Sequence, residues 1–193
     1  MITKAPRVPA GFAKLLKAGL AEAGAPAPVP GSPHPVYVLG LDRPRLAAAK
    51  LVGFRCLLLR GHGPRATAEV SVDSRGRAAA FSHVSHGPAA AETARLVRGG
   101  AREIAYLRVP GLSLGALWLR GAGGGEGDAV LPLRPLPPGW ESRRYPPAEF
   151  EARLASAAAR QLALHAAAQV TKLAPGRAAP SVRLRRARGP ELP

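Results

Sequence analysis

Cysteine is almost absent from this chain, which holds one, Cys56, in 193 residues. A single thiol forms no intramolecular disulfide, and it excludes both a multi-cysteine metal site and a CxxC redox motif. Cys56 lies among leucines in an apolar run, where a thiol packs as an unreactive side chain. The scarcity of cysteine fits a protein of a reducing compartment.

Long hydrophobic runs are missing as well. No stretch approaches the roughly 18 apolar residues that a membrane span needs. The N-terminal segment has neither the continuous apolar core nor the small-residue cleavage site of a secretory signal. We therefore expect a cytoplasmic bacterial protein with no membrane span.

Acidic residues are few, with 12 Asp and Glu against 28 Lys and Arg, a formal net charge of +16 and a pI of about 11.6. The carboxylates are scattered, so paired carboxylates for acid–base catalysis are not indicated. A basic surface gathers phosphate groups, but an excess of arginine, alanine, glycine and proline is also what a G+C-rich genome encodes. The charge leaves nucleic-acid binding and genome composition open as alternatives.

Aromatic residues make up only 5% of the chain, so the core depends on a few large side chains. The length and the 47% share of hydrophobic residues fit one domain. We expect Phe54, Phe81, Trp118 and Trp140 to anchor its core. The arginines are not interleaved with aromatics, so no stacking platform for bases is indicated.

The N-terminal part predicts a helix, a linker and a second helix. Apolar residues recur at helical spacing within residues 10–23, and we expect this amphipathic helix to pack on its own domain. The proline-rich residues 25–35 predict an extended linker. After a short strand at VYVLGL, Asp42 is placed to cap a helix that ends near Val52.

Strand patterns dominate the middle of the chain. The predicted strands are residues 54–60, 66–72 and 77–84, and then 103–109, 112–120 and 129–134. Short turns join the first three into a meander. In its middle strand Thr67, Glu69 and Ser71 alternate with small apolar residues, which predicts one solvated and one buried face.

Two further helices complete the prediction. Residues 88–98 form a helix that Pro88 opens and a glycine pair closes, and residues 148–173 form a long one. The expected core stripe of the long helix is Phe150, Leu154, Ala157, Gln161, Leu164 and Ala168. We therefore predict an α+β fold in which an antiparallel sheet of about six strands packs against helices, with a long C-terminal helix.

Three regions follow from these elements. Residues 1–34 comprise the amphipathic helix and the proline-rich linker, residues 35–173 form a single α+β domain, and residues 174–193 form a basic, disordered tail.

Two strand motifs carry a resemblance. FSHVSHGP at residues 81–88, with the helix behind it, and VPGLSLGALWL, followed by PLRPLPPG, resemble a group of uncharacterised bacterial proteins. In that group a strand ending in S-H-V-x-x-G-P leads to a helix, and a later V-P-x-L strand ends in A-L-W-L. The resemblance covers roughly residues 50–150. It implies a shared fold and no activity or catalytic residues.

His83 and His86, flanked by Ser82 and Ser85, are the densest set of reactive side chains. Residues three apart in a strand face opposite sides, so the two imidazoles converge on a metal only if the chain turns at Ser85. His62 and Asp73 are candidate third ligands, and no spacing rule selects either one. A serine–histidine pair is the alternative, but no GxSxG elbow is present. Neither hypothesis is preferred, and we expect no cofactor.

The C-terminal tail is rich in arginine. Its basic residues are Arg177, Arg183, Arg185, Arg186 and Arg188. Such an arm neutralises nucleic-acid phosphates without reading sequence, and it also suits an acidic protein partner. Arg143 and Arg144 could extend a nucleic-acid surface.

Three functions remain, in order of preference. The first is a non-enzymatic protein-interaction or structural module that binds a partner or itself through exposed strand edges. The second is a sequence-independent nucleic-acid-binding accessory protein that uses the arginine tail. The third is a metal-dependent or hydrolytic enzyme centred on His83 and His86.

Overall fold

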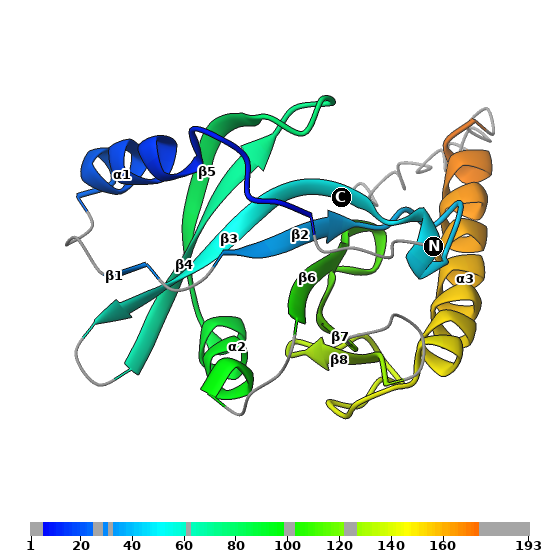
Figure 1. Cartoon of the computed structure of the whole chain (residues 1–193). Helices are drawn as coiled ribbons and strands as arrows, with labels where there is room; N and C mark the ends of the chain where they lie inside the picture. Colours follow the sequence, from blue (N-terminus) through cyan, green and yellow to red (C-terminus); the bar gives the residue numbers. More distant parts are fainter. Residues whose placement is uncertain are drawn as a thin grey trace, which may run out of the picture.

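The structure is a computed structural model that describes residues 6–24, 29–30, 33–60, 63–98, 103–121 and 127–173 (Figure 1). Its elements are α1 (Phe12–Glu22), β1 (Val29–Pro30), β2 (His34–Val38), η1 (Leu46–Ala48), β3 (Lys50–Arg60), β4 (Gly63–Val72), β5 (Ala78–His86), α2 (Pro88–Arg98), β6 (Glu103–Val109), η2 (Pro110–Leu112), β7 (Leu114–Arg120), β8 (Ala129–Leu133) and α3 (Pro147–Leu173). The predicted tail and part of the predicted linker lie outside the described residues.

Seven strands form an open sheet in the order β5-β4-β3-β2-β6-β7-β8, and the short β1 pairs with β3 beside this row. All neighbours are antiparallel except β2 and β6, which run parallel. The α+β class, the meander and the second group of three strands are thereby confirmed. The sheet has one strand more than the six expected, because β2 joins the two groups at its centre.

Two helices cover one face of the sheet. α1 packs Phe12, Leu16 and Leu20 against β3 and β4, which confirms that this helix packs on its own domain. α3 covers the β6–β8 half in a second cluster. Leu51 of β3 packs against both clusters, so both helices lie on the same side.

α2 lies on the opposite face (Figure 1). Its Ala90 and Ala94 pack against Leu57 of β3, and its Leu96 packs against a cluster from β6 to β8 that includes Leu117. α2 is short and covers only part of this face. Side chains on the uncovered part reach solvent.

The predicted helix from Asp42 to Val52 is wrong. The segment forms only the single 3₁₀ turn η1, and β3 already begins at Lys50. The backbone N–H of Leu46 donates to the Glu151 carboxylate at 2.7 Å, and Lys50 pairs with Val38 of β2. Contacts with α3 and β2 therefore override the local helical preference of an alanine-rich segment.

The solvated face predicted for the middle strand of the meander is also wrong in part. Thr67 and Glu69 of β4 are buried, at 3% and 4% exposure, and only Ser71 is half-exposed. α2 covers this side of β4 next to Thr67, and two arginines cover Glu69. Alternation of polar and apolar residues separated the two faces correctly, but neither face is solvated between Ala66 and Val70, because the apolar side chains there are buried as well.

Three of the four predicted anchors are buried, namely Phe54, Trp118 and Trp140, and Phe81 is half-buried. Tyr145 and Phe150, fully buried, complete the core beside Trp140, with ring centroids 6.0 and 5.4 Å from it in edge-to-face geometry. The core under α3 thus depends on three aromatic side chains, those of Trp140, Tyr145 and Phe150, which lie close together in the sequence.

Among the described side chains of α3, which end at Ala168, only those of the first turns are buried. Phe150, Leu154 and Ala157 are buried as predicted, but Gln161 is half-buried, Ala168 is exposed and Leu164 is 65% exposed. The core stripe therefore ends where the helix passes the edge of the sheet. No helix in the described part of the chain is long and apolar enough to cross a membrane.

Candidate functional site

β5 forms one border of the sheet and pairs with β4 alone among the described strands. Its nine residues, AAAFSHVSH, include no proline and no Lys, Arg, Asp or Glu. Unpaired backbone N–H and C=O groups along such a border are a template for another strand. Natural sheets commonly protect a border with proline or charge, and β5 has neither.

The opposite border of the sheet, β8, is protected. Pro132 removes a backbone donor in its middle. Val130 exchanges two backbone hydrogen bonds with Tyr145, at 2.8 and 2.9 Å, and the Ser142 hydroxyl donates to the Pro132 carbonyl. Within the described residues, the chain therefore covers one border of its sheet with its own backbone and not the other.

Next to the open border, polar side chains form a row across four strands. His83 of β5 pairs with Glu69 of β4, Glu69 with Arg55 of β3, and Arg55 with His34 of β2. Directly paired residues share a face of the sheet. The row lies on the α2 side and runs from the exposed His83 to buried positions.

Two arginines converge on Glu69. Arg55 Nη2 lies 3.3 Å from Glu69 Oε2, and Nη2 of Arg108 donates to the same oxygen from β6, two strands farther along the sheet. The guanidinium of Arg55 lies 3.7 Å from the ring centroid of Tyr106, and that of Arg108 lies 5.6 Å from it. We call His34, Arg55, Glu69, Tyr106 and Arg108 the polar cluster.

Two buried nitrogens of the polar cluster, His34 Nε2 and Arg55 Nε, have no hydrogen-bond partner among the described residues. Burial lowers the pKa of His34, with a smaller lowering from the Arg55 charge and an opposing effect from a hydrogen bond to the Ile104 backbone. His34 is therefore neutral at pH 7. The cluster holds two guanidinium cations and one carboxylate, so its net charge is positive.

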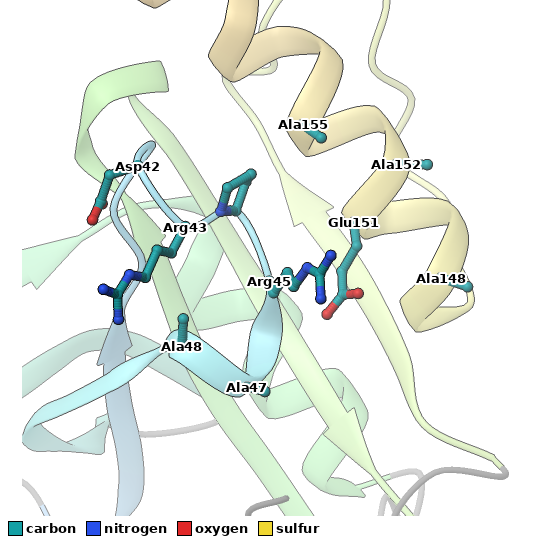
Figure 2. A pocket seen from close by; sticks show the side chains of 10 residues that line it. Asp42, Arg43, Arg45, Ala47, Ala48, Ala148, Glu151, Ala152 and Ala155 are labelled. Carbon is teal, nitrogen blue, oxygen red and sulfur yellow. The ribbon is translucent and has the colours of Figure 1, made fainter.

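A groove of about 870 Å³ lies between the loop that contains η1 and α3. Figure 2 shows Arg45 and Glu151 pointing toward one another across it, between small side chains that include Ala47 and Ala152. Its lining holds no serine, cysteine or histidine, and its two carboxylates are Asp42 and Glu151. It adjoins a second hollow of about 500 Å³, lined by residues that include Val38, Arg43 and Lys50. We call this the second hollow.

The HxxH pair does not converge. β5 continues in regular register from His83, opposite Glu69, to His86, opposite Ala66, so the chain makes no turn at Ser85. Both histidines are exposed, and alternation places them on opposite faces. His62 lies outside the described residues, and within those residues no three His, Cys, Asp or Glu side chains are grouped to hold a metal ion.

Arg143 is held by its own domain. It donates to Glu149 and to Glu141, the latter at 3.2 Å, and its guanidinium lies 3.9 Å from the Tyr145 ring centroid. The Glu149 carboxylate raises the pKa of Arg143 further. Arg144 is exposed, and the five arginines of the predicted tail lie outside the described residues. A nucleic-acid surface centred on Arg143 would need its carboxylate partners to be displaced.

Cys56 faces α1 in the buried cluster, and burial raises its pKa to about 11. The thiol is therefore protonated at neutral pH, as its apolar sequence context predicted. Sequence analysis did not identify the polar cluster, because its members lie up to 74 positions apart along the chain, as do His34 and Arg108. The one available signal was Glu69, the only acidic residue of β4.

Comparisons with protein-family models, with curated proteins and with solved structures found no match to this chain. The resemblance to a bacterial protein group therefore stays a prediction, and function has to be argued from the geometry.

Proposed function

We propose that this protein is a non-enzymatic interaction module that associates with a second copy of itself through strand addition at β5. The observation that carries the proposal is the contrast between the two borders of the sheet. β8 is covered by Tyr145 and interrupted by Pro132, whereas the outer edge of β5 has no strand partner among the described residues and carries neither proline nor charge.

The geometry of β5 defines where a partner strand fits. β5 has one extra residue relative to β4 at Ala79 and another at Ser82, so its regular part is residues 83–86. In an antiparallel pair related by two-fold symmetry, facing residues share a side of the sheet. A pairing centred on Val84 therefore places Val84 opposite its own copy and His83 opposite Ser85 of the second copy.

This register is self-complementary. Val84 packs against the apolar cluster under α1, so the Val84 pair extends an apolar surface. His83 and Ser85 lie on the other side of the sheet, where a histidine facing a serine brings no like charges together. Although the chain carries a net charge of +16, β5 itself carries no charged side chain, so pairing two copies of β5 sets no charges of this strand against each other.

The test is a charge-pairing experiment on the full chain. We expect sedimentation velocity over about 5 to 200 µM to show a concentration-dependent dimer. The variant His83→Lys/Ser85→Lys sets lysine opposite lysine and should be monomeric, and so should His83→Glu/Ser85→Glu. Mixing the two variants should restore a heterodimer, because each lysine then faces a glutamate.

A matched control adds the same two charges elsewhere. Ala159→Lys/Ala166→Lys alters two exposed positions of α3 and should dimerise like the natural chain. Circular dichroism of each variant checks that the monomers are folded. A natural chain that stays monomeric throughout, or a dimer that both β5 variants preserve, would refute strand addition between copies.

A further inference from the structure

The polar cluster contains more hydrogen-bonding capacity than its own residues use. Arg55 is 6% exposed, yet its Nε has no partner, and its cross-strand neighbour His34 leaves Nε2 equally unused. Buried polar groups almost always find a partner in the protein, in water or in a bound ligand. Two such atoms on paired residues point to a shared missing partner.

The charge of the cluster indicates the sign of that partner. Arg55 and Arg108 share a single oxygen of Glu69, and His34 is neutral, so one guanidinium charge has no carboxylate of its own. Stacking on Tyr106 stabilises a cation but does not neutralise it. A buried excess of positive charge favours an anion.

The cluster also has an opening. The side chain of Arg108 is 29% exposed, in contrast to 7% for Arg55 and 5% for Glu69. Arg108 pairs with Val38 of β2, and Val38 in turn pairs with Lys50. Val38 and Lys50 line the second hollow, together with Arg43 and the carboxylate Asp42. A hollow with two cationic side chains and one carboxylate therefore lies beside the most accessible arginine of the cluster.

We propose that the polar cluster binds a small oxyanion, a phosphate or carboxylate group, which accepts a hydrogen bond from Arg55 Nε and enters beside Arg108. A ligand that also carries a hydroxyl, such as hydrogen phosphate, satisfies both unused atoms, because neutral His34 offers Nε2 as an acceptor if its other nitrogen donates to Ile104. This proposal does not depend on strand addition at β5.

The probes are inorganic phosphate, acetate and chloride, titrated into the full chain at constant ionic strength. The readouts are the NMR signals of Arg55 Nε–H and of the His34 ring. We expect phosphate or acetate to shift both signals in a saturable way and to raise the apparent pKa of His34, because a nearby anion favours imidazolium. Chloride should have little effect, and the stronger of the two oxyanions identifies the ligand class.

Variants separate the site from general screening. Arg55→Lys keeps the charge but lacks the Nε–H, and it should weaken oxyanion binding at least about tenfold. The control Arg143→Lys changes a surface arginine and should bind within about twofold of the natural chain. If Arg55→Lys does not fold, Arg108→Gln replaces it as the test. Arg108 is partly exposed and lies where we propose that the anion enters, so this variant should also weaken oxyanion binding.

Three results would overturn the proposal. The first is an equal response to all three anions, which would indicate screening. The second is unchanged binding in Arg55→Lys or, where that variant does not fold, in Arg108→Gln. The third is an insensitive Arg55 signal with a long-lived water beside it, which would show that water satisfies the two nitrogens.

Discussion

The guanidinium of Arg55 lies 3.7 Å from the ring centroid of Tyr106, although Arg55 belongs to β3 and Tyr106 to β6. β2 runs between them and is parallel to β6, so the contact spans the point at which the two antiparallel halves of the sheet meet. Glu69 of β4 forms ion pairs with both Arg55 and Arg108 of β6, and so adds a further link between the same parts of the sheet. The polar cluster thus connects the two halves, and changes in it should affect both stability and recognition.

Glu69→Gln should destabilise the fold strongly. The substitution leaves two guanidiniums facing a neutral amide, one of them buried, and removing one partner of a buried ion pair typically costs about 3–5 kcal/mol. Glu92→Gln is the control, because the Glu92–Arg95 pair lies at the surface and should contribute less than about 1 kcal/mol. Urea unfolding measures both, and equal losses would argue against the cluster.

Gly19→Leu should separate α1 from the sheet. A Cβ at position 19 would lie 2.0 Å from the ring of Phe81, so any side chain has to displace that ring. We expect a loss of about 2–3 kcal/mol in the free energy of unfolding. Ala18→Leu, one residue away on the exposed side of α1, should change it by less than about 0.5 kcal/mol. Similar effects at both positions would contradict this packing.

His34 should make the protein less stable in acid. Its pKa is lowered in the folded state, chiefly by burial, so the unfolded chain binds the proton more tightly. The stability contribution is present above the ordinary value of 6.5 and is lost as the pH falls through the lower, folded value. His34→Gln should show a flatter dependence on pH below about 6.5 in urea unfolding. The exposed His83→Gln should keep the steeper dependence of the natural chain.

Cys56 should produce the opposite dependence at high pH. Burial raises its pKa from 9.0 to about 11, so the folded state retains a proton that the unfolded state releases. The stabilisation, about 2–3 kcal/mol, is present below about pH 9 and is lost as the pH rises through about 11. Cys56→Ala, compared with the natural chain at each pH, should lack this loss. Parallel declines in both proteins would refute it.

The nucleic-acid alternative makes a separate prediction about residues outside the described part. If the tail is a nucleic-acid arm, a chain that ends at Leu173 should lose most of the affinity of the full chain for short duplex DNA and single-stranded RNA. The slope of affinity against salt should fall with it, because fewer phosphates are neutralised. Equal and weak binding by both chains near physiological salt would show that the basic tail does not bind nucleic acid.

Local signals predicted most of the elements. Residues 73–77 and the glycine pair after residue 98 mark a turn and a helix end, and these chain reversals delimit β4, β5 and α2. Apolar spacing located α1 and the buried start of α3. Each of these signals lies within a few residues of the element that it specifies, which is why sequence alone sufficed.

The candidate site was much harder to predict from the sequence. His83 and His86 are adjacent in the sequence and do not converge, whereas Glu69 and Arg108 are 39 positions apart and form an ion pair. The segment from Asp42 to Val52 has helical composition, yet it forms only the 3₁₀ turn η1 and the start of β3. Glu151 accepts a hydrogen bond from the Leu46 backbone, and Lys50 pairs with Val38 of β2. Nearness along the chain was a poor guide to nearness in space.

The sequence by itself determined where the chain turns, which residues alternate along each strand, and that a single cysteine forms no intramolecular disulfide. The tertiary structure alone decided which polar residues are buried, which border of the sheet is left unpaired, and that β2 runs parallel to β6 between the two halves. The physical reason is that turns and periodicity depend on neighbouring residues, whereas burial and ion pairing depend on what other parts of the chain cover.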